Sequence, residues 1–182
     1  PDKEFEVLID KLQKQTMRPN KIILMNTEEK LVREFLEESK ILEKYDNIEI
    51  HHVSATEFDH GATRDMGVQF SKTPYFLCMT QDAIPADEFM IEELFKVLKK
   101  DNVASVYGKQ LARANCHILE NFTRKFNYPD QSRIKSKKDL NELGIKTYFC
   151  SNVCAAYKRE VYDKLGGFIK KTIFNEDMIY AA

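Results

Sequence analysis

The stretch Lys72-Thr-Pro-Tyr-Phe-Leu-Cys-Met-Thr-Gln-Asp-Ala-Ile-Pro85 decides how the rest of the chain is interpreted. Its apolar run, residues 75–79, predicts a strand that is buried on both faces. The run ends in Thr80-Gln-Asp82, and a proline shortly afterwards cannot continue a hydrogen-bonded ladder. Ligands of open α/β sheets bind beyond the carboxyl ends of the strands. We therefore expect Asp82 to face a ligand, although an aspartate in a turn or helix cap would look the same.

Strand and helix patterns alternate on both sides of this strand. Short apolar runs predict further strands at 21–25, 48–53 and 103–107. Helical spacing predicts helices with apolar faces formed by Phe5, Leu8, Ile9 and Leu12; by Leu31, Val32, Phe35 and Leu36; by Met66 and Phe70; and by Phe89, Leu94 and Leu98. Glu29 is placed for a capping box, and Gly166-Gly167 for a glycine stop after a helix at 158–165. This alternation predicts an α/β fold with a mixed, mostly parallel sheet and helices on both faces.

Bulk properties narrow the class of protein. The length of 182 residues predicts one domain, which would bury roughly 70% of the surface that the unfolded chain exposes. The net charge is -1, which does not favour nucleic acid as a partner. No apolar run approaches the roughly 20 residues that cross a bilayer. The four cysteines form no Cys-x-x-Cys pair, and Cys150 and Cys154 lack zinc-site neighbours, so we expect reduced thiols in a cytoplasmic protein.

Residues 111–138 interrupt the alternating pattern. Basic and aromatic side chains are mixed here without clear periodicity. Three interpretations stay open at this point: an acceptor-binding lobe, a membrane-facing flap with peripheral membrane association, or a solvated helical insertion with a few core anchors.

Four further features occur in a fixed order along the chain. Asn26 ends the first visible strand, and Phe58-Asp-His-Gly-Ala-Thr-Arg-Asp65 opens a helix. Gln81-Asp82-Ala-Ile-Pro85 ends the buried strand, and Gly166-Gly-Phe168 precedes Glu176-Asp177. Each motif alone is a weak signal, but together the sequence resembles glycosyltransferase family 2, inverting enzymes with the GT-A fold. The resemblance covers essentially the whole chain and is greatest to the rhamnosyltransferase branch.

The resemblance implies a function and two functional halves. The chain would transfer a sugar, such as rhamnose, with inversion from a nucleotide-diphosphate donor to a polysaccharide or glycolipid acceptor. Residues 1–110 would bind the nucleotide sugar and residues 111–182 the acceptor, in the cytoplasm or at the inner face of the membrane. A nucleotidyltransferase and a non-catalytic carbohydrate-binding domain are the alternatives, and the oligomeric state is open.

The resemblance also implies roles for individual residues. Asp82 would bind a divalent metal, Mg or Mn, although Thr80 stands where the family carries a first acid. A hard cation of this kind stabilises the charge of a departing diphosphate. Asp177 would be the general base, with Glu176 as the second candidate. The other implied positions are Asn26, Gly61, Arg64 and Gln81 for donor binding, His60 beside the donor, and Asn152 and Phe168 on the acceptor side.

The ends of the chain carry a further expectation. The chain starts at Pro1 and stops within a helical pattern, so we expect a piece of a longer protein, truncated at both ends. The family's first, central strand would precede Pro1. Its absence would leave two rows of backbone groups without partners, which another segment would have to fill.

Overall fold

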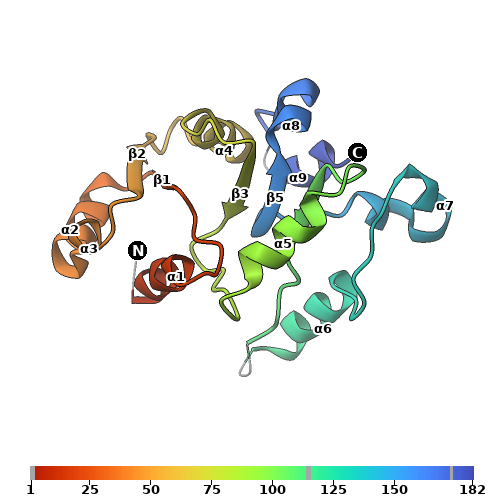
Figure 1. The fold of residues 1–182 in the computed structure, drawn as a ribbon, viewed down its shortest axis with the longest axis horizontal. Helices are drawn as coiled ribbons and strands as arrows, with labels where there is room; N and C mark the ends of the chain where they lie inside the picture. Colours follow the sequence, from red (N-terminus) through yellow and green to blue (C-terminus); the bar gives the residue numbers. More distant parts are fainter. Residues whose placement is uncertain (1–2, 114–115, 173) are drawn as a thin grey trace.

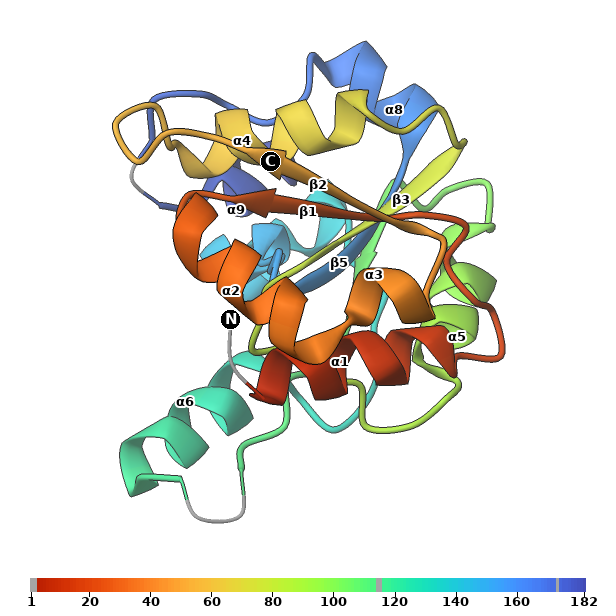
Figure 2. The same ribbon diagram turned by 90° about the vertical axis from the view of Figure 1, so that its left-hand side faces the viewer.

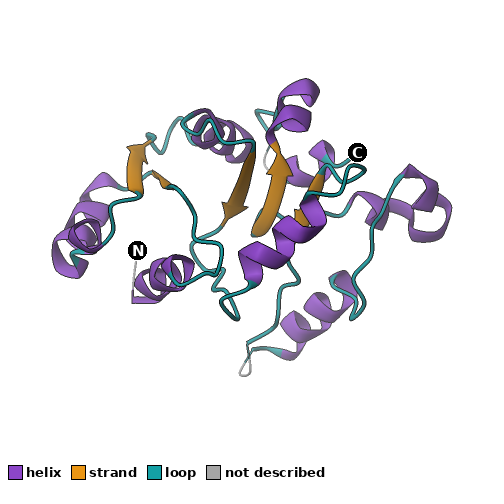
Figure 3. Ribbon diagram, viewed as in Figure 1, coloured by secondary structure: helices purple, strands orange, loops and turns teal. Residues whose placement is uncertain are grey.

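The computed structural model describes residues 3–113, 116–172 and 174–182, and its strands gather in the middle with helices on either side (Figures 1 and 3). Its elements are, in order, α1 (Lys3–Gln13), β1 (Ile22–Asn26), α2 (Glu29–Ser39), α3 (Ile41–Lys44), β2 (Ile48–His52), α4 (His60–Gln69), β3 (Tyr75–Met79), α5 (Met90–Leu98), β4 (Ser105–Tyr107), α6 (Ile118–Asn127), η1 (Lys137–Asp139), α7 (Leu140–Leu143), η2 (Gly144–Tyr148), β5 (Cys154–Lys158), α8 (Arg159–Leu165) and α9 (Glu176–Tyr180). The expected alternation of strands and helices is confirmed through β4.

The strands form two sheets. Strands β1 and β2 pair in parallel, with Asn26 opposite His52 at their carboxyl ends. The second sheet has the order β3-β5-β4, and β5 runs antiparallel to both neighbours. The α/β class with a mixed sheet is thus as expected, but parallel pairing is confined to β1 and β2 among the described residues. Strand β5 comes from the second half of the chain, so both halves contribute to one sheet.

Strand β3 packs on both faces, as its apolar run predicts. Phe76 and Cys78 contact the core formed by α4, β5 and α8, with buried Tyr157, Tyr162 and Phe168 among its members. Tyr75, Leu77 and Met79 face the opposite way, toward α1, α5 and β4. Successive strand residues point to opposite faces, which gives this division.

The expected gap in the sheet is present. Among the described residues, β1 and β3 each pair along one edge only, and no strand joins them. A cavity of about 760 Å³ lies there, lined by both strands and by α1, α2, α4 and α5. This gap is why α2 buries only Val32 of its predicted apolar face, with Leu31 53% exposed.

Several local expectations need correction. Helix α2 begins after Glu28 without a side-chain cap, so the capping box involving Glu29 is wrong. Phe89 precedes α5 and is exposed, whereas Leu94 and Leu98 are buried as expected. Met66 and Phe70 are also exposed, and the buried residues of α4 are Gly61, Thr63 and Val68. The glycine stop is confirmed: Gly166 has a φ of 85°, a left-handed conformation that suits glycine.

Residues 111–138 contain α6, which projects from the body of the molecule (Figure 2). No residue of α6 is buried, but Tyr128 directly after it is a core anchor at 4% exposure. In the described part of the chain, no helix combines the length and apolar character that a bilayer-spanning segment requires.

Candidate functional site

Several residues expected to bind the donor line the cavity between β1 and β3. Asn26, His60, Arg64 and Gln81 all contribute to its wall, together with long apolar stretches of both strands. The Asn26 amide nitrogen lies 3.0 Å from Nδ1 of His52, which fixes the amide at the carboxyl end of β1. Gly61, Asp82 and Asp177 do not line this cavity.

Helix α4 begins in the motif that the sequence singled out. Asp59 caps it, because its carboxylate accepts a hydrogen bond of 2.7 Å from the Ala62 N–H. Gly61, expected to contribute to donor binding, also has a role in packing. A Cβ at this position would lie 1.9 Å from the Ile169 carbonyl oxygen, so glycine is required for packing within the protein.

Asp65 has a structural environment as well. Its carboxylate accepts a hydrogen bond of 2.9 Å from the Tyr162 hydroxyl and lies 3.1 Å from Lys170 Nζ. These contacts attach α4 to α8 and to the loop that leads to α9.

Arg64 links the cavity to the acidic motif at the other end of the chain. Its guanidinium lies 2.5 Å from Oε1 of Glu176, and the Glu176 side chain is only 6% exposed. The same Glu176 oxygen accepts a hydrogen bond of 3.2 Å from the Asn152 side-chain amide. A buried carboxylate needs such partners to offset its lost hydration.

Asp177 is held by the backbone. Its Oδ2 accepts a hydrogen bond of 2.8 Å from the Asn152 N–H, and its Oδ1 accepts one of 2.8 Å from the Met178 N–H. Burial raises the pKa of this carboxyl above its ordinary value, and the Glu176 carboxylate adds to the rise. A carboxylate with a raised pKa is a better proton acceptor, which is what a general base requires.

Asn152 and Phe168 are too deeply buried for direct acceptor contact. Asn152 is 1% exposed, and its side-chain oxygen accepts a hydrogen bond of 2.7 Å from the Tyr157 hydroxyl. Phe168 is 2% exposed and packs against the rings of Tyr157, Tyr162 and Tyr180. Asn152 therefore contacts the acidic motif directly, whereas Phe168 packs against Tyr180 of α9, the helix that carries the motif.

Sequence reasoning did not single out Tyr157. The side chain is completely buried, and its hydroxyl orients the Asn152 side-chain amide, which contacts Glu176. In the sequence it is one more aromatic residue of an apolar run, and no local pattern distinguishes it from an ordinary core residue.

Asp82 lies in an exposed turn after β3, as the sequence predicts. The Thr80 N–H donates to the Val153 carbonyl, 3.2 Å away, so this turn adjoins the segment that holds Asp177. The Thr80 hydroxyl is buried and has no hydrogen-bond partner among the described residues.

The residues around Asp82 fit a divalent metal only as part of its ligand set. Carboxylate and hydroxyl oxygens are donors that Mg²⁺ and Mn²⁺ accept. In the described part of the chain, no three acidic, His or Cys side chains gather into a metal-binding group.

Comparison with known proteins decides the family. Residues 3–166 match Glycosyl transferase family 2. The chain belongs to this family. The resemblance inferred from the sequence motifs is thereby confirmed.

Two curated relatives are O-antigen chain rhamnosyltransferases. RfbN of Salmonella typhimurium is 37% identical over 178 residues, which cover 96% of this chain and 54% of the relative. WbaN of Salmonella anatum is 39% identical over 171 residues, which cover 93% and 52%, respectively. This family 2 chain thus spans about half the length of these relatives, and the expected similarity to the rhamnosyltransferase branch is confirmed.

Solved structures confirm the GT-A fold. The mannosyltransferase PcManGT of Pyrobaculum calidifontis, in complex with GDP-Man and Mn²⁺, has a TM-score of 0.61 at 16% identity and covers 97% of this chain and 47% of its own. TarS of S. aureus, in complex with UDP-GlcNAc, has a TM-score of 0.66 at 15% identity and covers 99% and 49%.

Proposed function

We propose that this chain forms the donor-binding and base-bearing part of an inverting glycosyltransferase. The observation that carries the proposal is the position of Asp177: two backbone N–H groups hold its carboxylate, and burial raises its pKa. Its neighbour Glu176 is joined to Arg64, which lines the cavity between the sheets. A proton acceptor is thus fixed beside a site that can hold a ligand.

Inverting transfer is a direct displacement at the anomeric carbon. The acceptor hydroxyl must lose its proton while it attacks from the face opposite the leaving nucleotide. Asp177 would accept this proton, a contribution of roughly 10²–10⁴-fold. Asn26, Arg64 and Gln81 would orient the nucleotide end of the donor, because their polar groups lie along one cavity.

Asp82 would hold Mg²⁺ or Mn²⁺ together with oxygen atoms of the donor diphosphate. When bound, the cation would stabilise the negative charge of the leaving group. The solvent-exposed Asp82 side chain supports this proposal, as does the Thr80 hydroxyl, which has no hydrogen-bond partner among the described residues.

The donor and acceptor are proposed from the relatives. The two curated relatives, O-antigen chain rhamnosyltransferases, favour rhamnose as the sugar and a growing surface polysaccharide or glycolipid as the acceptor. The thymidine diphosphate part of the donor is proposed from the resemblance of the sequence motifs to the rhamnosyltransferase branch. We place this activity in the cytoplasm at the inner face of the membrane, with residues 1–110 serving the donor and residues 111–182 the acceptor.

The test is calorimetric titration with nucleotide sugars, combined with a transfer assay with and without Mn²⁺. Asp177→Asn should lose at least about 100-fold in turnover while donor affinity stays within about twofold. Asp82→Ala should lose the response to metal, whereas the exposed control Asp101→Asn should keep it. Loss of donor affinity in Asp177→Asn would contradict its assignment as base.

A non-catalytic carbohydrate-binding domain is the second candidate, because Thr80 replaces the first metal-binding acid expected in the family. Such a domain would bind free sugar without metal in the same titration. A preference for nucleoside triphosphate over nucleotide sugar would instead indicate a nucleotidyltransferase.

A further inference from the structure

Helix α6 turns its polar side toward the protein. Within this helix, Arg124 and Asn127 are half-buried and every other residue is exposed. The Arg124 guanidinium lies 3.8 Å from the Glu120 carboxylate and donates a hydrogen bond to the Gln110 side chain. Gln110 in turn donates to the Ser151 hydroxyl at 2.9 Å. Polar contacts therefore attach α6 to the body of the molecule.

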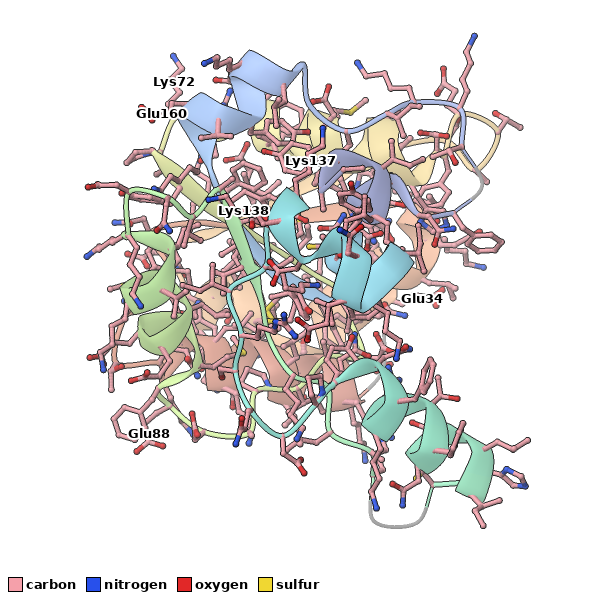
Figure 4. The ribbon with its side chains drawn as sticks, turned by 90° about the vertical axis from the view of Figure 1, so that its right-hand side faces the viewer. Glu34, Lys72, Glu88, Lys137, Lys138 and Glu160 are labelled. Carbon is pink, nitrogen blue, oxygen red and sulfur yellow. The ribbon has the colours of Figure 1, made fainter. Side chains whose placement is uncertain are left out.

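The apolar side of α6 consequently points away from the protein. Ile118, Leu119, Phe122 and Phe126 are 78%, 67%, 67% and 58% exposed. Their spacing places them on one arc of the helix, and the two phenylalanine rings stack 6.1 Å apart. Figure 4 shows α6 extending beyond the rest of the molecule. A surface helix of a water-soluble protein normally turns its apolar side toward the core. An exposed apolar face of this kind typically marks an interaction site.

The sequence segment that contains α6 is basic. Residues 109–146 contain nine Lys and Arg but four Asp and Glu, a net charge of +5 in a chain whose total is -1, although Lys137 and Lys138 lie apart from α6 (Figure 4). Lys125 follows the Arg124 position on the helix, and the Lys146 ammonium lies 3.2 Å from the centre of the Phe126 ring. Lys146 also donates a hydrogen bond of 3.0 Å to the Phe126 carbonyl. Positive groups thus border the apolar arc.

We propose that the exposed face of α6, bordered by Lys125 and Lys146, binds the surface of an anionic lipid bilayer. An outward apolar arc can enter the acyl boundary, and the lysines can reach the negatively charged head groups. A second copy of the chain is a poorer partner, because a symmetric dimer would bring two basic regions together. The inference deepens the proposed function and rests on it for the location at the inner face of the membrane, but lipid binding itself requires neither donor nor turnover.

Vesicle sedimentation tests the apolar arc. The protein should bind mixed phosphatidylglycerol and phosphatidylcholine vesicles, and added salt should weaken this binding. The double variant Phe122→Ser, Phe126→Ser should bind at least about tenfold more weakly, because two large apolar groups no longer enter the bilayer. The control variant Phe89→Ser, Leu165→Ser, which removes apolar side chains that are 47% and 59% exposed elsewhere on the surface, should bind like the wild type.

A second vesicle experiment tests the basic border formed by Lys125 and Lys146. The variant Lys125→Gln, Lys146→Gln should lose about fivefold per removed charge on anionic vesicles and remain unchanged on pure phosphatidylcholine. Equal binding of the wild type to both vesicle types would overturn the proposal. The proposal would also be overturned if the double phenylalanine variant bound vesicles as tightly as the wild type does.

Two further measurements separate lipid binding from dimerisation and from donor binding. Light scattering measures whether the protein forms a dimer. A wild-type dimer that the phenylalanine substitutions abolish, together with an absence of vesicle binding, would show that a second copy of the chain covers the face, and would refute the proposal. Donor titration of the same variant should match the wild type, since α6 does not line the cavity. Failure of lipid binding therefore leaves the proposed transferase activity testable on its own.

Discussion

The ion pair between Arg64 and Glu176 offers the sharpest test of the site. Glu176→Gln keeps the shape of the side chain but removes its charge, so the guanidinium loses a partner that lies 2.5 Å away. Breaking a buried pair from one side costs about 3–5 kcal/mol. Because the Arg64 side chain is 21% exposed and lines the cavity, we expect a value near the lower limit, about 3 kcal/mol.

Urea denaturation followed by circular dichroism measures this loss. With a slope of about 2 kcal/mol per molar, the unfolding midpoint should fall by about 1.5 M in Glu176→Gln. Arg64→Gln should lose a similar amount, because it leaves the nearly buried carboxylate without its cation. Glu29→Gln is the matched control: it breaks the exposed pair with Arg33 and should cost under about 0.5 kcal/mol.

The double variant Arg64→Gln, Glu176→Gln decides whether the two residues act as a pair. Two neutral amides leave no buried charge, so the double variant should be at least about 2 kcal/mol more stable than the sum of the single losses predicts. If the two losses simply add, the residues do not interact in solution and the connection between cavity and acidic motif is refuted.

Three other predictions follow from the same region. Gly61→Ala should destabilise the fold by more than about 2 kcal/mol, because its Cβ would meet a backbone oxygen, whereas Gly67→Ala in the same helix meets only a flexible methionine side chain; thermal unfolding that ranks them in the opposite order would contradict this packing. Tyr157→Phe should cost about 1–3 kcal/mol in a chemical denaturation experiment, because the Asn152 oxygen is left without its donor; an unchanged midpoint would show that this hydrogen bond contributes nothing. The folded-state pKa of Asp177 lies above its ordinary value of 3.8, so the contribution of this carboxyl to stability is present below that pH and is lost as pH rises through the raised pKa. Glu176→Gln removes the neighbouring negative charge and should lower the pKa of Asp177, so the acidic limb of the pH–rate profile for transfer should move to lower pH. A shift of this limb to higher pH would refute the electrostatic argument.

The sequence predicted the local elements well where the signal is itself local. The bounds of β3 are those of its apolar run, because polar residues and a proline end the pattern sharply. Gly166 adopts the left-handed conformation that only a glycine stop favours. The motifs that carry the family resemblance are also local, and the family match confirms them.

Tertiary structure alone decided which distant residues meet. Arg64 and Glu176 are 112 positions apart, so no local pattern in the sequence brings them together. The antiparallel insertion of β5 between β3 and β4 likewise depends on pairing across the chain. That insertion buries Tyr157 and Asn152, and Phe168 packs against the same core.

Sequence alone thus established the class of the fold, the family motifs, an acidic position beyond a buried strand and an acidic pair at the start of the last helix. It did not establish that Gly61 contacts protein backbone, that Phe168 is core, or that α6 faces outward. The physical reason is that periodicity reports which side of an element is apolar, whereas the neighbour on that side is determined only when distant segments pack together.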